Sequence, residues 1–243
     1  GSAAEGRPGV SAALAAPGCA PGPQQTTFLP SEPPPPTAPG LRRLRAAEPG
    51  VIDFHPAEDI VRGPCNPDVR AQDLAAMDAE VKVCTKCRLH ATRTRTVFGV
   101  GNPCARVAFV GEGPGAEEDR RGEPFVGRAG QLLDRIVAAM SLRRADVYIG
   151  NTVKCRPPEN RVPYPDEMEA CAPYLRRQLE TICPQVLVAL GRPAAQALLG
   201  VNASLGELRG RFHRHRGIPV MVTYHPAYLL RNPGAKKTTW EDV

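Results

Sequence analysis

The chain has 243 residues, of which 42% are hydrophobic, so it is long enough to form one or two domains with a real core. No stretch reaches the roughly 18 to 20 apolar residues that a membrane-spanning helix needs, so we expect no membrane span. The formal net charge is +6, and residues 81–243 hold 25 Lys and Arg against 15 Asp and Glu, which favours a polyanionic partner.

The N-terminal part of the chain differs in composition from the rest. Its first fifty residues contain 11 prolines and 7 glycines, including the run from Pro33 to Pro36. Such residues resist both helix and sheet. Hydrophobic periodicity becomes frequent only from about Asp73 onward. We therefore expect a disordered extension over residues 1–72 and one folded domain over residues 73–243.

Short apolar runs alternate with helical patterns along the folded part. The expected strands are Val107 to Val110, Val147 to Ile149, Val186 to Leu190 and Val220 to Thr223. The expected helices are Gly130 to Met140, Pro165 to Ile182 and Pro193 to Leu199. This alternation predicts a three-layer α/β/α domain around a central, mainly parallel sheet of four strands.

Each expected strand runs directly into a polar or glycine-containing segment. These segments are Gly111 to Gly115, Asn151, Gly191-Arg192 and His225-Pro226. In open α/β sheets the carboxyl ends of the strands form the ligand crevice. Residues that are far apart in the sequence should therefore meet in one site.

The cysteines suggest a metal centre. Cys84 and Cys87 form a C-x2-C pair, and Cys155 and Cys171 form a second pair with 15 residues between them. Four soft ligands fit either a tetrahedral zinc ion or an iron-sulfur cluster, and spacing alone does not separate the two. Four unrelated buried thiols are the other alternative. The remaining cysteines, which we interpret as structural or incidental, are Cys19, Cys65, Cys104 and Cys183.

The glycine loop also satisfies a relaxed dinucleotide-binding pattern, Gly111-x-Gly113-x-x-Ala116. A nucleotide-dependent oxidoreductase is therefore an alternative. The loop is followed by three acidic residues, Glu117 to Asp119, where a pyrophosphate would require a helix N-terminus free of negative charge. This sequence context argues against the oxidoreductase.

Four residues near the strand ends could together bind a planar nucleobase. Such a pocket needs a stacking surface, hydrogen bonds to the edge of the base, and groups that manage charge when a bond to the base breaks. Phe125 can stack, Asn151 can pair with the edge, and Glu112 and His225 can manage charge. Taken singly, each has a plain structural interpretation, such as core packing for Phe125 or a turn for Asn151. Their joint arrival at strand ends favours the pocket.

Four sequence segments resemble the iron-sulfur, family 4 uracil-DNA glycosylases. They are CTKCRLHATRTRTVFGVGNP (Cys84 to Pro103), GEGPGAEEDRRGEPFVGRAGQLLD (Gly111 to Asp134), NTVKCRPPENRVPYP (Asn151 to Pro165) and HPAYLLRNP (His225 to Pro233). Together they run across nearly all of the expected domain. The resemblance implies the fold of these enzymes and a DNA N-glycosylase that flips uracil out of DNA and hydrolyses its glycosidic bond, the first step of base excision repair.

The resemblance also implies the roles of individual residues. A 4Fe-4S cluster would bind Cys84, Cys87, Cys155 and Cys171, which decides between the cluster and zinc. The residues that would contact uracil are Glu112, Gly113, Pro114, Phe125, Asn151 and His225. Glu112, Asn151 and His225 would carry the chemistry, and Asn151 would distinguish uracil from cytosine.

The resemblance further implies a DNA-contacting segment and a setting for the protein. Leu229, Leu230 and Arg231 would form a wedge that occupies the space left by the flipped base. The alternative for the leucines is core packing. We expect an intracellular, cytoplasmic protein of bacterial or archaeal type that acts as a monomer on uracil-containing DNA. A catalytically weak uracil sensor and an iron-sulfur oxidoreductase are the competing functions.

Overall fold

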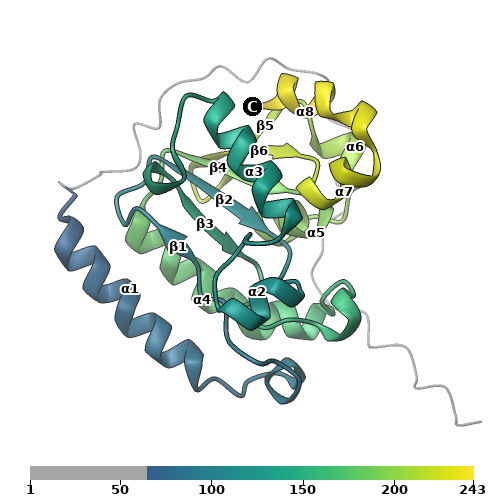
Figure 1. Cartoon of the computed structure of the whole chain (residues 1–243). Helices are drawn as coiled ribbons and strands as arrows, with labels where there is room; N and C mark the ends of the chain where they lie inside the picture. Colours follow the sequence, from purple (N-terminus) through teal and green to yellow (C-terminus); the bar gives the residue numbers. More distant parts are fainter. Residues whose placement is uncertain (1–64) are drawn as a thin grey trace, which may run out of the picture. The chain divides into compact units, whose positions relative to one another are not determined.

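A mainly parallel sheet forms the centre of the structure, a computed structural model that describes residues 65–243. Its strand order is β1-β3-β2-β4-β6-β5 (Figure 1). The strands are β1 Val100–Gly101, β2 Val107–Gly111, β3 Tyr148–Asn151, β4 Val186–Leu190, β5 Phe212–His215 and β6 Ile218–Thr223. The four inner strands run parallel, whereas β1 and β5 pair antiparallel with β3 and β6 at the two edges.

The four expected strands are confirmed as the inner strands, but the expected number of four is wrong because two edge strands extend the sheet to six. β1 has only two residues, too few to give a pattern. β5 reads Phe-His-Arg-His and none of its residues is fully buried, so it contains no apolar run. Edge strands need only one pairing partner, and they can form from sequences without the apolar signature of buried strands.

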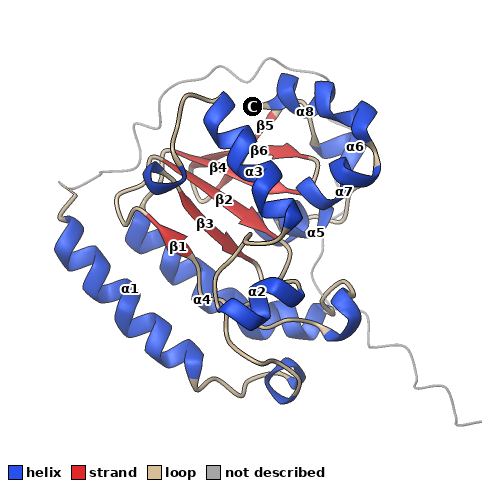
Figure 2. Cartoon of the chain, viewed as in Figure 1, coloured by secondary structure: helices blue, strands red, loops and turns tan. Residues whose placement is uncertain are grey.

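Helices cover both faces of the sheet (Figure 2). The α-helices are α1 Pro67–Lys82, α2 Ala116–Arg121, α3 Arg128–Ala139, α4 Pro165–Ile182, α5 Arg192–Leu199, α6 Leu205–Leu208, α7 Pro226–Arg231 and α8 Lys236–Asp242. Short 3-10 helices lie at Arg88–Ala91, Arg144–Asp146, Pro158–Asn160 and Pro233–Ala235. The expected helix at Pro165 to Ile182 is confirmed at both ends, and the other two expected helices begin one or two residues earlier than predicted.

Alternate residues of each strand build two separate cores. Ala108 and Val110 of β2 pack in one core with side chains of α1, α4 and α5. Phe109, which lies between them in the sequence, packs in the other core with Leu133 and Val137 of α3. Successive side chains of a strand point to opposite faces, so both faces of this sheet are covered. The expected three-layer α/β/α fold is confirmed.

The first helix begins before the expected domain boundary. Asn66 caps α1, because its side-chain oxygen accepts hydrogen bonds from the backbone N–H groups of Asp68 at 3.1 Å and Val69 at 3.3 Å. Pro67 occupies the first helical turn, where the missing N–H costs nothing. Ordered structure therefore starts at least six residues before Asp73. Most of the extension expected over residues 1–72 lies outside the described residues.

The parallel register brings the candidate residues to one edge of the sheet. Gly111 at the end of β2 pairs with Asn151 at the end of β3. β6 ends at Thr223, two residues before His225. The carboxyl ends of these strands therefore meet as the sequence predicted. In the described part of the chain, every helix is too short or too polar to cross a membrane.

Candidate active site

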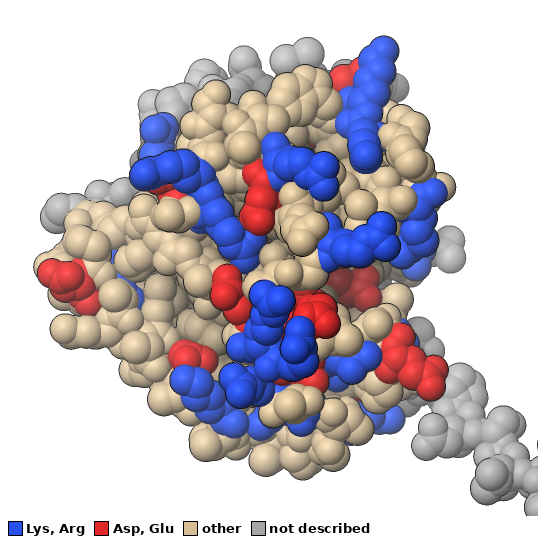
Figure 3. Space-filling view, viewed as in Figure 1, with Lys and Arg blue, Asp and Glu red and all other residues tan. Residues whose placement is uncertain are grey.

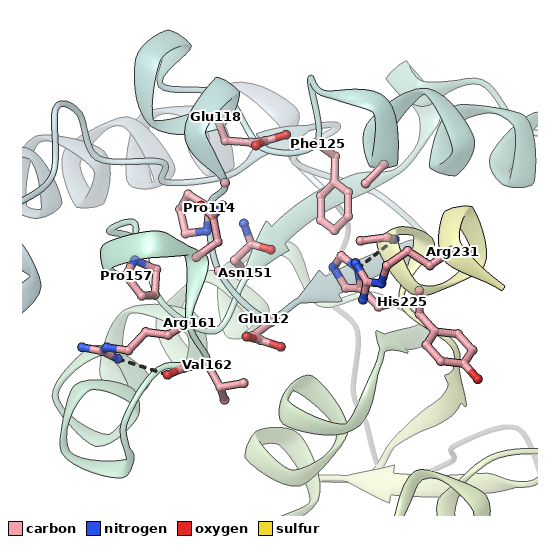
Figure 4. A pocket seen from close by; sticks show the side chains of 16 residues that line it. Glu112, Pro114, Glu118, Phe125, Asn151, Pro157, Arg161, Val162, His225 and Arg231 are labelled. Carbon is pink, nitrogen blue, oxygen red and sulfur yellow. Dashed lines mark hydrogen bonds between the residues drawn. The ribbon is translucent and has the colours of Figure 1, made fainter.

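The four residues expected to share a site do line one pocket, with a volume of about 450 Å³. Glu112 follows β2, Asn151 ends β3, and His225 follows β6, while Phe125 lies in the turn between α2 and α3. Figure 4 shows their side chains converging on the same space, with Phe125 and His225 on one side of Asn151. The expected neighbours Gly113 and Pro114 also line this pocket.

Asn151 presents an amide that the protein leaves unsatisfied. The residue is buried, and its Oδ1 atom has no hydrogen-bond partner among the described residues. Such an atom in a native fold requires an explanation, because burying an unpaired acceptor costs about 1–3 kcal/mol. Because the residue lines the pocket, a bound molecule with an N–H group could supply the missing donor. The Asn151 amide is therefore a candidate group for contact with a ligand.

Gly111 makes room for both Asn151 and Phe125. A Cβ atom at position 111 would lie 2.4 Å from Asn151 Oδ1 and 2.7 Å from the Cζ atom of Phe125. Real side chains do not approach so closely. The glycine at the end of β2 is therefore required by close approach of two pocket side chains, and not by an unusual backbone conformation.

The Phe125 turn is held in a conformation that is uncommon for a phenylalanine. Its φ angle is 53°, and the ring is 6% exposed. A carboxylate stabilises the turn, because Glu118 Oε1 accepts hydrogen bonds from the N–H groups of Val126 and Gly127, both at 3.0 Å. Gly130, in the first turn of α3, packs directly against the Phe125 carbonyl, where a Cβ atom would lie only 1.8 Å from the oxygen. Strained residues of this kind cluster at ligand sites, and here the strain orients an aromatic face.

His225 is held neutral with a defined tautomer. Burial, assisted by the nearby Arg231 charge, lowers its pKa to about 4. Its Nδ1 atom accepts a hydrogen bond from the backbone N–H of Ala227 at 3.1 Å, which also caps α7. A neutral imidazole that accepts at Nδ1 carries its proton on Nε2. His225 can therefore donate a hydrogen bond without bringing a positive charge, and its ring lies 5.6 Å from that of Phe125.

Glu112 contributes a carboxylate to the pocket. Burial raises its pKa above the ordinary value, and the positive charge of Arg192 opposes that shift. Its backbone oxygen is occupied, because it accepts hydrogen bonds from the Thr152 hydroxyl and from Val153 N–H at 3.2 Å. The backbone is thus fixed to the loop that leaves β3. The charged side chains of Glu118, Arg161 and Arg231 also line the pocket.

Sequence reasoning missed one wall of the pocket. This wall is the loop that follows Cys155 and includes Pro157, Asn160, Arg161 and Val162. No sequence pattern marks this wall, because its anchor is Glu167 of α4, a carboxylate that is fully buried in the structure. Arg161 donates to both of its oxygens, at 2.6 and 2.8 Å, and Tyr164 N–H donates at 2.8 Å. The acidic first turn of α4 therefore anchors the loop as well as the helix.

The expected wedge segment is only partly available. Leu229 is 1% exposed and belongs to the interior, so the expectation that it contacts DNA is wrong in this conformation. Leu230 is half-buried, and Arg231 is exposed and lines the pocket. Tyr228, which stacks on Tyr224 with ring centroids 5.0 Å apart, is exposed and also lines the pocket. A helical turn brings residues 228 and 231 to the same face and turns Leu229 inward.

The four paired cysteines line a second cavity of their own. Cys84, Cys87, Cys155 and Cys171 surround it, together with Arg93 and Tyr174. Burial raises the pKa of the Cys171 thiol to about 11. Within the described residues, no three His, Cys, Asp or Glu side chains form a group that could hold a single metal ion. The thiols thus enclose a common space without converging on one point.

Hydrogen-bond donors face these thiols. Arg93 Nη1 donates to the Cys155 sulfur at 3.2 Å and to the Cys84 carbonyl at 2.8 Å, which ties the two cysteine pairs together. Tyr174 and Lys154 also line this cavity beside the cysteines. Donors of this kind stabilise negative charge on sulfur and accompany metal-bound thiolates.

The other cysteines behave differently. Cys65 and Cys104, which showed no pairing in the sequence, form a disulfide with Cα atoms 6.1 Å apart. Cys183 ends α4 in the left-handed conformation, with φ 48°. Cys19 lies outside the described residues. Neither Cys65 nor Cys104 lines the cysteine cavity.

Comparison with known proteins gives consistent matches. Residues 98–243 match the model of the Uracil DNA glycosylase superfamily. A "Type-4 uracil-DNA glycosylase" of Thermotoga maritima is 48% identical over 165 residues, which cover 67% of this chain and 86% of that protein. The protein of the same name from Archaeoglobus fulgidus is 48% identical over 162 residues, which cover 63% and 81%. That of Saccharolobus solfataricus is 46% identical over 172 residues, which cover 67% and 80%.

The close approach at Gly111 gives a testable consequence for stability. Gly111→Ala should lower the free energy of unfolding by about 1–3 kcal/mol, because the added methyl group overlaps Asn151 and Phe125. Urea denaturation measures this. Gly206→Ala is the control, because the helical position has no atom closer than 4.0 Å and should not be destabilised. Equal stability of Gly111→Ala and the unchanged chain would mean that the two side chains do not meet there.

Proposed function

The chain belongs to the Uracil DNA glycosylase superfamily and, within it, to the type-4 uracil-DNA glycosylases, and from this membership we propose how its pocket removes uracil from DNA. The expected family and enzyme class are thereby confirmed. The chain is a DNA glycosylase that acts in DNA repair. The single observation that carries the proposal for the site is the buried, unpaired Asn151 Oδ1 in a pocket with an aromatic wall.

Uracil complements the polar groups of the pocket. It has an N3–H donor between two carbonyl acceptors, O2 and O4. Asn151 Oδ1 would accept from N3–H, and its amide nitrogen would donate to O4. Cytosine has an amino group and a bare nitrogen at these positions, so it would leave buried polar groups unpaired. Phe125 would stack on the flat face of the base. An everted nucleotide can reach such a pocket, whereas a base within a duplex cannot.

The charged transition state defines the roles of Glu112 and His225. When the bond between N1 and C1′ breaks, its electron pair leaves with uracil, and the sugar becomes cationic. Water then adds to C1′, and the proton that it loses balances the charge of the uracil anion. The Glu112 carboxylate would stabilise the sugar cation or position the water. The Nε2–H group of His225 would donate to O2, where negative charge develops, and a neutral donor fits its lowered pKa.

We propose that Cys84, Cys87, Cys155 and Cys171 hold a 4Fe-4S cluster. A zinc ion would need all four sulfurs about 2.3 Å from one point, whereas a cluster offers each thiolate its own iron and fits thiols around a wider space. The hydrogen bond from Arg93 to the Cys155 sulfur supports this assignment. The cluster would cross-link the segment before Arg88, the loop after β3 and helix α4. No step of the uracil chemistry needs an electron, so its role would be structural.

The DNA strand would cross the rim of the pocket. The exposed side chains there are Tyr228 and Arg231 on α7 and Asn160 and Val162 on the opposite loop. Figure 3 shows many Lys and Arg side chains on the face it presents, interspersed with Asp and Glu. Arginines can bind phosphates, and an exposed aromatic or apolar side chain can support the unstacked neighbours of the flipped base. Of the wedge expected from the sequence, Leu230 and Arg231 therefore remain in this proposal, with Tyr228 added to them.

Excision of uracil from a labelled oligonucleotide tests the function and the role of Asn151 together. The unchanged chain should leave abasic sites, which alkali converts to strand breaks that a gel resolves. Asn151→Asp should reduce the excision rate by about 10²-fold or more, because it loses the donor to O4 and places a carboxylate beside that oxygen. Asn202→Asp, at an exposed position away from the pocket, is the matched control. Full activity of Asn151→Asp would remove the recognition role.

The acid limb of the pH profile should belong to Glu112. The mechanism needs its carboxylate, and burial raises its pKa, so the single-turnover rate should fall with decreasing pH at values above the ordinary 4.5. No limb is expected near 6.5, because the pKa of His225 is about 4 and its ring stays neutral there. In Glu112→Gln the residual rate should lose the acid limb. An unchanged limb in that variant would assign it to another group.

Metal analysis tests the cluster independently of excision. Chain purified without oxygen should contain about four iron atoms and four sulfides. Cys171→Ser should lose most of this iron, whereas Cys183→Ser should keep it, because Cys183 does not line the cysteine cavity. Stoichiometric zinc in place of iron would contradict the proposal.

A further inference from the structure

Lys154 is a buried lysine between the two sites. It follows Asn151 by three residues and directly precedes Cys155. The side chain is 1% exposed. Its Nζ atom donates a hydrogen bond to the backbone oxygen of Asn151 at 2.8 Å and lies 5.9 Å from the centroid of the Phe98 ring. The side chain thus closes the turn that leaves β3, with the recognition residue at one end and a cysteine at the other.

The charge of Lys154 has no carboxylate partner in the described part of the chain. Buried ammonium groups are paired in stable proteins, because desolvation without compensation is costly. One hydrogen bond to a carbonyl and an aromatic ring compensate only part of this cost. The negative charge nearest to the lysine is therefore expected on sulfur.

The cysteine cavity offers this negative charge. Lys154 lines the cavity together with the four cysteines. Four thiolates around a 4Fe-4S cluster carry a net negative charge, which a buried ammonium would balance. The residue thus lines the cysteine cavity and, through its Nζ atom, binds the Asn151 carbonyl.

Asn151 depends on its backbone for position. Its Oδ1 atom has no hydrogen-bond partner among the described residues, so no bond to that oxygen fixes the amide. The backbone carbonyl is at the end of β3, where the ladder to β2 stops, and Lys154 Nζ donates to it. A shift of this carbonyl would move the amide away from the edge of the base, and displacements of about 1 Å can cost about 10²-fold in rate.

We propose that Lys154 is a positioning residue, whose ammonium balances the charge of the iron-sulfur cluster and holds the Asn151 carbonyl, so that the cluster and the uracil-recognition amide are linked through one side chain. This inference rests on the cluster proposed above. Under this proposal the cluster affects base recognition through the position of Asn151, and no electron transfer is involved. Loss of the cluster would leave the ammonium unbalanced, and the turn that carries Asn151 would then relax.

Two substitutions separate the charge of Lys154 from its hydrogen bond. Lys154→Met removes both and keeps an unbranched side chain of similar length. Lys154→Gln removes the charge and keeps an amide donor for the Asn151 carbonyl. The matched control is Lys86→Met, because Lys86 is exposed, lies over the Tyr174 ring, and is located between Cys84 and Cys87. It removes a positive charge beside the same cysteines without touching Asn151.

Three measurements on the purified holoproteins test the proposal. They are the iron content, the midpoint potential of the cluster, and the affinity for free uracil by calorimetry. Lys154→Met should bind uracil at least about tenfold more weakly, and its potential should become more negative because reduction adds an electron near a lost positive charge. Lys154→Gln should show the same direction of potential shift, with uracil affinity within about threefold of the unchanged chain. Lys86→Met should change neither property appreciably, because solvent screens its charge.

Each outcome decides the proposal. Loss of iron from both Lys154 variants, with iron retained in Lys86→Met, also supports it. Unchanged uracil affinity and unchanged potential in Lys154→Met would overturn it. Where Lys154→Met yields no folded protein, an unchanged potential in Lys154→Gln overturns it. An unchanged chain that contains no iron would end the cluster proposal itself, so the two can fail separately.

Discussion

A buried amide oxygen without a hydrogen-bond partner costs about 1–3 kcal/mol, and Asn151 carries such an atom at the end of β3. This oxygen lies at the edge of the sheet where β2, β3 and β6 end and where Glu112, Asn151 and His225 line one pocket. In the function proposed above, uracil satisfies this polar group. Discrimination would follow from the same cost, because a base with the wrong edge would leave the amide unpaired and lose its own hydration.

The rest of the site keeps the amide and its surroundings in place. Gly111 and Gly130 allow the close approaches that seat Phe125, and Glu118 binds the backbone of its turn. On the other side, Glu167 anchors the loop that carries Arg161. These supporting groups hold the walls of the pocket through their own hydrogen bonds and close contacts. They fix the geometry before the ligand arrives, which is the main way a protein lowers the barrier to a reaction that develops charge.

Much of this arrangement could be predicted from the sequence. Apolar runs located the inner strands, and helix signals such as Pro165 with its following acidic residues located α4. The positions after the strands identified Glu112, Asn151 and His225 because parallel strands end at a common edge. Phe125 was predicted as a stacking surface because it is an aromatic residue in the segment that follows the glycine loop, although a turn residue has no periodic pattern.

Other parts could not be predicted, for physical reasons. A strand of two residues such as β1 carries no pattern. The inward position of Leu229 depends on where α7 begins, since a shift of one residue rotates a helical side chain by about 100°. The wall near Arg161 arises from a contact with Glu167, a charged residue that sequence rules place at the surface. The disulfide between Cys65 and Cys104 joins segments 39 residues apart, and sequence spacing does not reveal such pairs.

We propose that Asn151, Phe125 and His225 contact the same uracil ring. A crystal structure of the holoprotein with free uracil tests this most directly. We predict that uracil lies against the Phe125 ring, with N3–H and O4 within hydrogen-bond distance of the Asn151 amide and O2 near His225 Nε2. Uracil bound elsewhere, or bound in this pocket with the Asn151 amide still unpaired, would contradict the account.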